Sequence, residues 1–149
     1  MTAEPPLFVY GTLTVDEVLR ALIGRVPARR PGAVAGWRAA ALRGHPFPGL
    51  VPADGEARGF VLTDLADGEL DLLDAFEGPA YERQPLELTD GTAVVGYVWL
   101  DEPRALADDW DVERFRSDEL PAYLERCAAW LAGVRTGRGR PRRSAARRR

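Results

Sequence analysis

The sequence predicts an α+β domain: a small, mostly antiparallel, curved sheet or β-barrel with flanking helices. Short apolar runs that resemble strands outnumber the amphipathic helical segments along the chain. Glycine and proline separate these runs at intervals of roughly 8 to 12 residues, a spacing typical of sandwiches and barrels. The 149 residues, 46% of them hydrophobic, are enough for a single domain with a buried core.

The first half of the chain opens on a buried strand and continues mainly as strands. Leu7–Tyr10 is a short apolar run of β type. A short helix follows, with Thr14 or Asp16 as its N-cap. It extends to about Ile23, where Gly24 supplies the stop. Three further strand segments are expected, at residues 34–42, 45–51 and 58–63.

The middle of the chain predicts a helix and then a hairpin. The helix covers 67–77, with Asp67 as N-cap, apolar side chains on neighbouring turns and a Gly-Pro stop after it. Strands are expected at 81–88 and 92–100. Asp90-Gly91, which joins them, is a strong short-range hairpin signal.

A final helix is predicted at residues 119–132, with Ser117 or Asp118 as its cap. Its apolar residues recur with a 3.6-residue period and form one stripe. Cys127 lies on that stripe, so we interpret it as a core residue rather than a nucleophile. His45 is interpreted as a loop or pocket-rim residue. The acids Asp71 and Asp74 are expected to face water.

Charge divides the chain into a domain at 1–134 and an arginine-rich tail at 135–149. All 20 basic residues are arginine, and eight lie between Arg135 and Arg149, where no acid occurs. The remainder carries 12 − 23 = −11. The tail suits either a nucleic-acid arm or a disordered terminus. We favour the disordered terminus, since the acidic domain itself would repel nucleic acid.

The composition favours a cytoplasmic protein. No apolar run approaches the roughly 18 to 20 residues of a membrane helix, and the N-terminus lacks the pattern of a signal peptide. A single cysteine excludes an internal disulfide. We expect no membrane partner and either a monomer or a weak dimer.

Glu77 is the first candidate for chemistry. It follows Leu73 by four residues, so helical geometry directs it along the apolar stripe. It also lies at the helix C-terminus, where the macrodipole disfavours negative charge. Both effects raise a carboxyl pKa toward the working range of a general base. Two structural alternatives remain: a frayed glutamate in solvent, or one paired with Arg83.

The second candidate is the segment Val9-Tyr10-Gly11-Thr12-Leu13. A buried strand that breaks at glycine and leads into a helix exposes successive backbone N–H groups, which can hold a carboxylate. Taken alone, the segment is better explained as an ordinary turn between strand and helix, because a single glycine is no phosphate-loop signature.

Together these motifs resemble the γ-glutamylcyclotransferase-like family, and in particular its AIG2-like branch. The resemblance extends over about 7–100, most of the folded chain. It rests on Phe8-Val9-Tyr10-Gly11-Thr12-Leu13, Gly44-His45-Pro46-Phe47-Pro48-Gly49-Leu50-Val51, Leu73-Asp74-Ala75-Phe76-Glu77-Gly78 and Tyr81-Glu82-Arg83.

The resemblance implies a small barrel with a cavity at one end, in which Glu77 is the catalytic acid and base. It implies conversion of a γ-glutamyl amine or amide to 5-oxoproline and a free amine, with no metal or organic cofactor. The residues it assigns to substrate binding are Tyr10, Gly11, Thr12, Leu13, Tyr81, Arg83 and Tyr97. Substrate specificity is expected in the wall around 44–51. The alternative is a non-catalytic module that binds a small ligand or a protein on the same fold.

Overall fold

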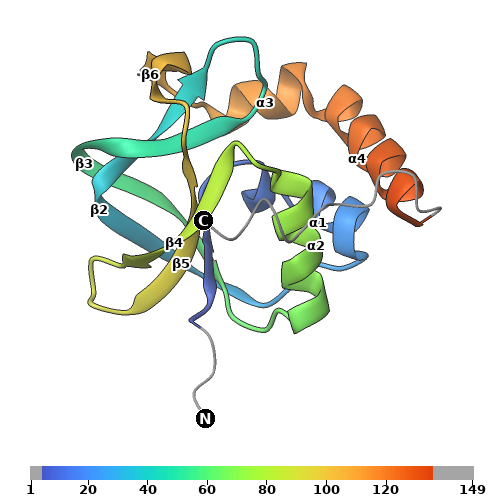
Figure 1. The fold of residues 1–149 in the computed structure, drawn as a ribbon, viewed down its shortest axis with the longest axis horizontal. Coiled ribbons are helices and arrows are strands. Elements are labelled where there is room, and N and C mark those ends of the chain that lie inside the picture. Colours follow the sequence, from blue (N-terminus) through green and yellow to red (C-terminus); the bar gives the residue numbers. More distant parts are fainter. Residues whose placement is uncertain (1–4, 136–149) are drawn as a thin grey trace.

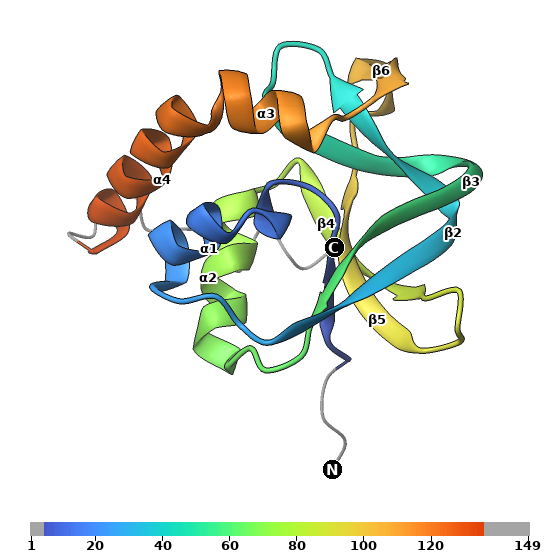
Figure 2. The same ribbon diagram turned by 180° about the vertical axis from the view of Figure 1, so that it is seen from behind.

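The computed structural model describes residues 5–135. The expected tail, except for Arg135 itself, lies outside these residues. Six strands form one curled, half-barrel sheet in the order β4-β5-β1-β3-β2-β6, and β5 also pairs with β3. The strands curl around one side of the molecule, and α1, α2 and α4 gather on the other (Figures 1 and 2). The α+β fold class is therefore confirmed.

A long hairpin dominates the sheet. Its strands are β2 (Arg29–Leu42) and β3 (Pro48–Leu62). The register shifts between Ala35 and Trp37, where β3 holds extra residues opposite β2. Gly36 and Gly55, both with positive φ, lie at this irregularity. Such a bulge bends a strand without ending it. The two separate strands expected at 45–51 and 58–63 are thus one continuous strand.

The short strand β1 (Leu7–Val9) lies in the middle of the sheet and is wholly buried. It pairs antiparallel with β3 and parallel with β5 (Ala93–Trp99). A Cβ added to Gly59 would lie 1.9 Å from the carbonyl oxygen of Val9. Only glycine allows the two strands to approach so closely, and this approach fixes where the loop after β1 leaves the sheet.

The predicted hairpin is present, with β4 (Tyr81–Glu87) antiparallel to β5. Gly91 in the connecting turn has a φ of 91°. The predicted middle helix is α2 (Asp67–Glu77), although Ala66 rather than Asp67 is its N-cap residue. The first helix, α1 (Asp16–Ile23), ends at Gly24 in the left-handed conformation.

The segment 101–118 contains structure that the sequence analysis did not anticipate. A 3₁₀ turn at Glu102–Arg104 leads into β6 (Ala105–Asp109), which pairs with β2. The helix α3 (Val112–Asp118) is capped by Asp111, whose carboxylate accepts from two backbone N–H groups. The final helix, α4 (Leu120–Arg135), follows directly. Ser117 and Asp118, expected as caps, belong to α3.

The core has two main parts, one on each face of the sheet. One lies between the sheet and the helices and includes Leu19, Leu73 and Cys127. The other lies inside the curl of the strands around Phe8 and Leu50. Burial raises the pKa of the Cys127 thiol to about 11, as expected for a core cysteine.

Candidate active site

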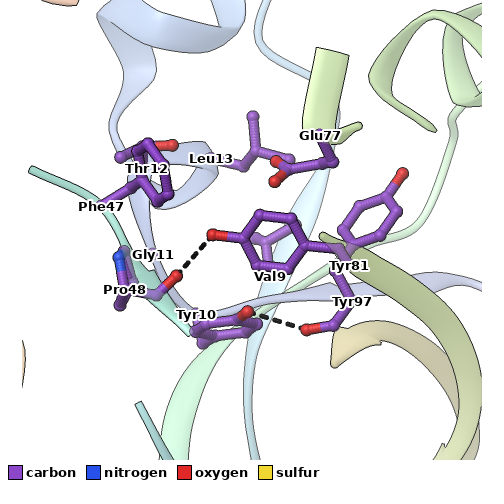
Figure 3. Close-up of a pocket in the computed structure, with 10 residues that line it drawn as sticks. All are labelled: Val9, Tyr10, Gly11, Thr12, Leu13, Phe47, Pro48, Glu77, Tyr81 and Tyr97. Atoms are coloured by element: carbon purple, nitrogen blue, oxygen red, sulfur yellow. Dashed lines mark hydrogen bonds between the residues drawn. The ribbon is translucent and has the colours of Figure 1, made fainter. Parts of the chain in front are cut away.

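A narrow pocket opens where the loop after β1 meets the end of α2 (Figure 3). It holds about 300 Å³ of empty space, including the part open to solvent. Seven of the eight site residues predicted from the sequence line it; Arg83 does not. The lining residues are Val9, Tyr10, Gly11, Thr12, Leu13, Phe47, Pro48, Glu77, Tyr81 and Tyr97.

Glu77 is the last residue of α2, and Gly78 ends the helix immediately after it. Its carboxylate is directed into the pocket that Leu13 and Tyr81 also line (Figure 3). Burial, reinforced by the negative charge of Asp74, raises the pKa of Glu77 to about 8. Among residues 5–135, Glu77 makes no hydrogen bond or ion pair. The group therefore combines a pKa near neutrality with unused acceptor capacity.

Asp74 lies one helical turn before Glu77 and corrects two expectations. It does not face water: its side chain is 10% exposed and lies 3.3 Å from Arg83. The Tyr97 hydroxyl donates to it at 2.5 Å. The pairing of Glu77 with Arg83, considered as an alternative, is absent because Asp74 takes that guanidinium.

The loop after β1 forms a 3₁₀ turn at Thr12–Thr14. The backbone N–H and the hydroxyl of Thr14 both donate to the carbonyl of Gly11, at 2.9 and 2.6 Å. The first N–H groups of a helical turn have no partner within it, so Thr12 and Leu13 present donors at the pocket. The Thr12 hydroxyl lies 3.3 Å from that of Tyr123. The turn is thus held by its own hydrogen bonds to Gly11 and by Tyr123, and the N–H groups of Thr12 and Leu13 remain available to a ligand.

Gly11 allows this loop to lie against the start of β3. A Cβ at Gly11 would lie 2.5 Å from Cγ of Pro48 and 2.8 Å from its Cδ. Real Cβ atoms do not approach so closely, so glycine is required here for packing and not for an unusual φ. The absence of a side chain at Gly11 therefore leaves room for the Pro48 ring.

Two tyrosine hydroxyls hold the pocket wall together. Tyr10 donates to the carbonyl of Tyr97 at 2.7 Å and accepts from the N–H of Leu50 at 3.1 Å. Tyr81 donates to the carbonyl of Pro48 at 2.7 Å. Burial raises the pKa of both phenols, and the negative charge of Glu77 adds to this rise. Both therefore remain neutral hydrogen-bonding groups that shape the pocket.

Aromatic rings surround the mouth of the pocket. Phe47 stacks on His45 with ring centroids 4.7 Å apart and packs edge-on against Trp99 at 6.5 Å. Burial, followed by the nearby charges of Arg104 and Arg126, lowers the pKa of His45. The only histidine is thus a neutral ring beside the pocket at neutral pH, outside the residues that line it.

Within residues 5–135 no group of three or more His, Cys, Asp or Glu side chains is arranged to hold a metal ion. No helix in this part of the chain is long and apolar enough to cross a membrane.

Sequence reasoning missed Asp74 as a neighbour of the site. Its position three residues before Glu77, on the same helical face, was the available signal.

Comparison with known proteins adds to this geometry. The family model described as "Gamma-glutamyl cyclotransferase, AIG2-like" matches residues 7–113. AIG2-like protein C of Arabidopsis thaliana is 34% identical over 137 residues, covering 87% of this chain and 79% of that protein. AIG2-like protein D of the same plant is 32% identical and covers 80% and 84%.

A solution structure of an Arabidopsis thaliana protein matches with a TM-score of 0.61 and 29% identity, covering 97% of this chain and 94% of the other. A crystal structure of an uncharacterized Pyrococcus horikoshii protein matches with a TM-score of 0.54 and 16% identity, covering 76% and 96%. At that identity the second likeness concerns the fold alone.

Proposed function

Because the chain belongs to the γ-glutamyl cyclotransferase, AIG2-like family, we propose that it converts a small γ-glutamyl amine or amide to 5-oxoproline and a free amine. One observation supports the proposal: the Glu77 carboxyl group, which has no partner within residues 5–135 and a pKa of about 8, shares a pocket with the N–H groups of Thr12 and Leu13. The turn supplies donors for an anion, and Glu77 supplies an acceptor for an ammonium. A γ-glutamyl head carries both groups on one carbon.

The reaction is an intramolecular acyl transfer. The α-amine of the γ-glutamyl group, once deprotonated, attacks its own γ-carbonyl carbon. A new C–N bond closes the five-membered lactam, and the original amide C–N bond breaks to release the amine. Because both reacting groups belong to one molecule, the protein needs mainly to hold the substrate in the attacking geometry. No water is consumed and no cofactor is required.

In this mechanism Glu77 moves the proton. It first binds the substrate ammonium and accepts one of its protons, which leaves a neutral amine that attacks, and it returns that proton to the departing nitrogen. The attacking nitrogen loses a second proton as the lactam forms, and this proton passes through Glu77 to the released amine, which leaves as an ammonium. A pKa of about 8 suits both directions near neutral pH. The N–H groups of Thr12 and Leu13 hold the α-carboxylate or the oxyanion that develops on the γ-carbonyl oxygen. The substrate folds against the pocket wall, which includes Tyr10, Tyr81 and Tyr97.

The test is release of 5-oxoproline from a panel of γ-glutamyl amino acids, γ-glutamyl amines and glutathione. Wild type and Glu77→Gln are compared side by side, with Glu125→Gln, exposed on α4, as control. Glutamine keeps the shape of the side chain but cannot accept the proton. We expect kcat to fall by at least roughly 10²-fold in Glu77→Gln and to be unchanged in the control.

Equal turnover by wild type and Glu77→Gln would refute the role of Glu77. Absence of turnover for every substrate, combined with thermal stabilisation by γ-glutamyl compounds, would favour a non-catalytic binding module on the same fold. Absence of both turnover and stabilisation would refute the γ-glutamyl pocket itself.

A further inference from the structure

An arginine of α4 lies at the mouth of the pocket. The guanidinium carbon of Arg126 is 5.6 Å from the centroid of the Phe47 ring and 5.6 Å from that of the Tyr123 ring. Phe47 lines the pocket, and the Tyr123 hydroxyl contacts Thr12 in the turn. Tyr123 and Arg126, three residues apart, share one face of the helix. The cation therefore lies over one ring that lines the pocket and over a second that contacts the Thr12–Thr14 turn.

Arg126 is exposed and forms no hydrogen bond or ion pair with any of residues 5–135. This is unusual in the described part of the chain, where most arginines pair with an acid. Arg104, also near the mouth, pairs with Asp101 at 3.3 Å. The cation–π contacts place the guanidinium over the two rings but use none of its five N–H donors.

The charge of Arg126 acts on the pocket. Burial is the main cause of the raised pKa of Tyr81, and the positive charge of Arg126 opposes this rise. Tyr123 behaves in the same way, with Arg126 again acting against burial. Both phenols lie close to Glu77, whose charge raises their pKa. The positive charge of Arg126 at the mouth and the negative charge of Glu77 inside the pocket therefore act on the same two phenols.

The geometry of the proposed reaction assigns an occupant to this cation. With the γ-glutamyl head between Glu77 and the Thr12–Thr14 turn, the group on the far side of the scissile amide extends toward the mouth. A guanidinium that lies over aromatic rings and keeps its N–H donors unused binds a carboxylate through paired N–H groups. An anionic leaving group would gain this contact, and an uncharged one would leave the guanidinium unpartnered.

We propose that Arg126 binds a carboxylate on the leaving amine. γ-Glutamyl amino acids are then preferred over γ-glutamyl compounds whose leaving amine has no carboxylate. This rests on the proposed cyclotransferase function and names its substrate class. Arg126 is in this proposal a specificity residue and takes no part in proton transfer.

The test compares γ-glutamyl-alanine with γ-glutamyl-alaninamide, which differ only in that carboxylate. For wild type, Arg126→Gln, Arg126→Lys and Arg114→Gln we would measure kcat/KM for 5-oxoproline release from each. Arg114, whose side chain ion-pairs with Asp118, controls for loss of a positive charge. The ratio of the two values cancels any effect of a substitution on folding.

We expect wild type to favour the acid and Arg126→Gln to lower the acid-to-amide ratio by roughly tenfold or more, mainly through KM. Arg126→Lys should retain part of the preference, and Arg114→Gln should retain all of it. A ratio that is the same in wild type and Arg126→Gln, with turnover intact, overturns this proposal and leaves the proposed function standing.

Calorimetric titration of the same variants with the two compounds separates the remaining outcomes. Tighter binding of the acid that depends on Arg126, without 5-oxoproline release, supports carboxylate recognition and refutes cyclisation. If neither compound binds and neither is turned over, both proposals fail together.

Discussion

Replacement of Glu77 by glutamine should stabilise the fold, and increasingly so as the pH rises. The pKa of Glu77 is raised from 4.5 to about 8. Between these two values the group keeps its proton in the folded protein and loses it in the unfolded chain. Unfolding therefore releases a proton, so that the free energy of unfolding falls with rising pH. Glutamine does not titrate and removes this dependence.

The shift sets the size of the effect. A difference of about 3.5 pKa units corresponds to about 4.8 kcal/mol at pH well above 8, at about 1.36 kcal/mol per unit. Relative to Glu77→Gln, wild type should lose about 2.5 kcal/mol between pH 5 and pH 7 and about 1.4 kcal/mol more by pH 9. Solvent reaches the pocket, so these values are upper limits.

Urea unfolding followed by tryptophan fluorescence measures the difference at pH 5, 7 and 9. Taking wild type minus Glu77→Gln at each pH cancels the other titrating groups, and matched m-values confirm that the same surface unfolds. Glu125→Gln on the exposed face of α4 controls for the loss of a glutamate as such. A difference that stays constant from pH 5 to pH 9 would refute the reasoning.

Asp74→Asn removes the like charge beside the proposed base, so the acidic limb of the pH profile of kcat/KM should move to lower pH; an unmoved limb contradicts this. Gly11→Ala places a Cβ 2.5 Å from Pro48 and should cost about 1 to 3 kcal/mol in urea unfolding. Gly68→Ala in α2, with no neighbour within 4 Å, is its control and should not destabilise. Tyr81→Phe loses the hydrogen bond to the Pro48 carbonyl and should cost about 1 kcal/mol with less than tenfold loss of kcat/KM, since the ring remains; a larger kinetic loss would assign the hydroxyl a role in the reaction.

Local signals predicted those elements whose boundaries are set locally. The α2 helix has its stop in Gly78, and the β4–β5 hairpin has its turn in Asp90-Gly91. The continuity of β3 could not be predicted in this way. Pro52 and Gly55 predict a break in the strand, yet β3 continues through them because the register shifts opposite Ala35. Pairing across a sheet, rather than propensity along the chain, decides such a strand.

The same distinction explains the site. Helical spacing placed Glu77 on the buried side of α2, and the structure brings it to the pocket. The same spacing applied to Asp74 would have directed it inward as well. Its partners Arg83 and Tyr97, however, come from two strands of the hairpin and meet it only in the folded protein. A contact between α2, β4 and β5 produces no recognisable sequence pattern in any one of these elements.

Asp74 and Glu77 lie one turn apart on α2 but differ in their partners, and this difference is the strongest argument that Glu77 binds a ligand. Asp74 receives both the Tyr97 hydroxyl and the Arg83 guanidinium, whereas Glu77 receives no partner within residues 5–135. A buried acid without a partner destabilises the fold once it ionises. A ligand ammonium would supply the missing partner and lower the pKa of Glu77 again. Binding at neutral pH should then release a proton from Glu77, so stronger binding as the pH rises toward 8 is a property that a purely structural glutamate would not confer.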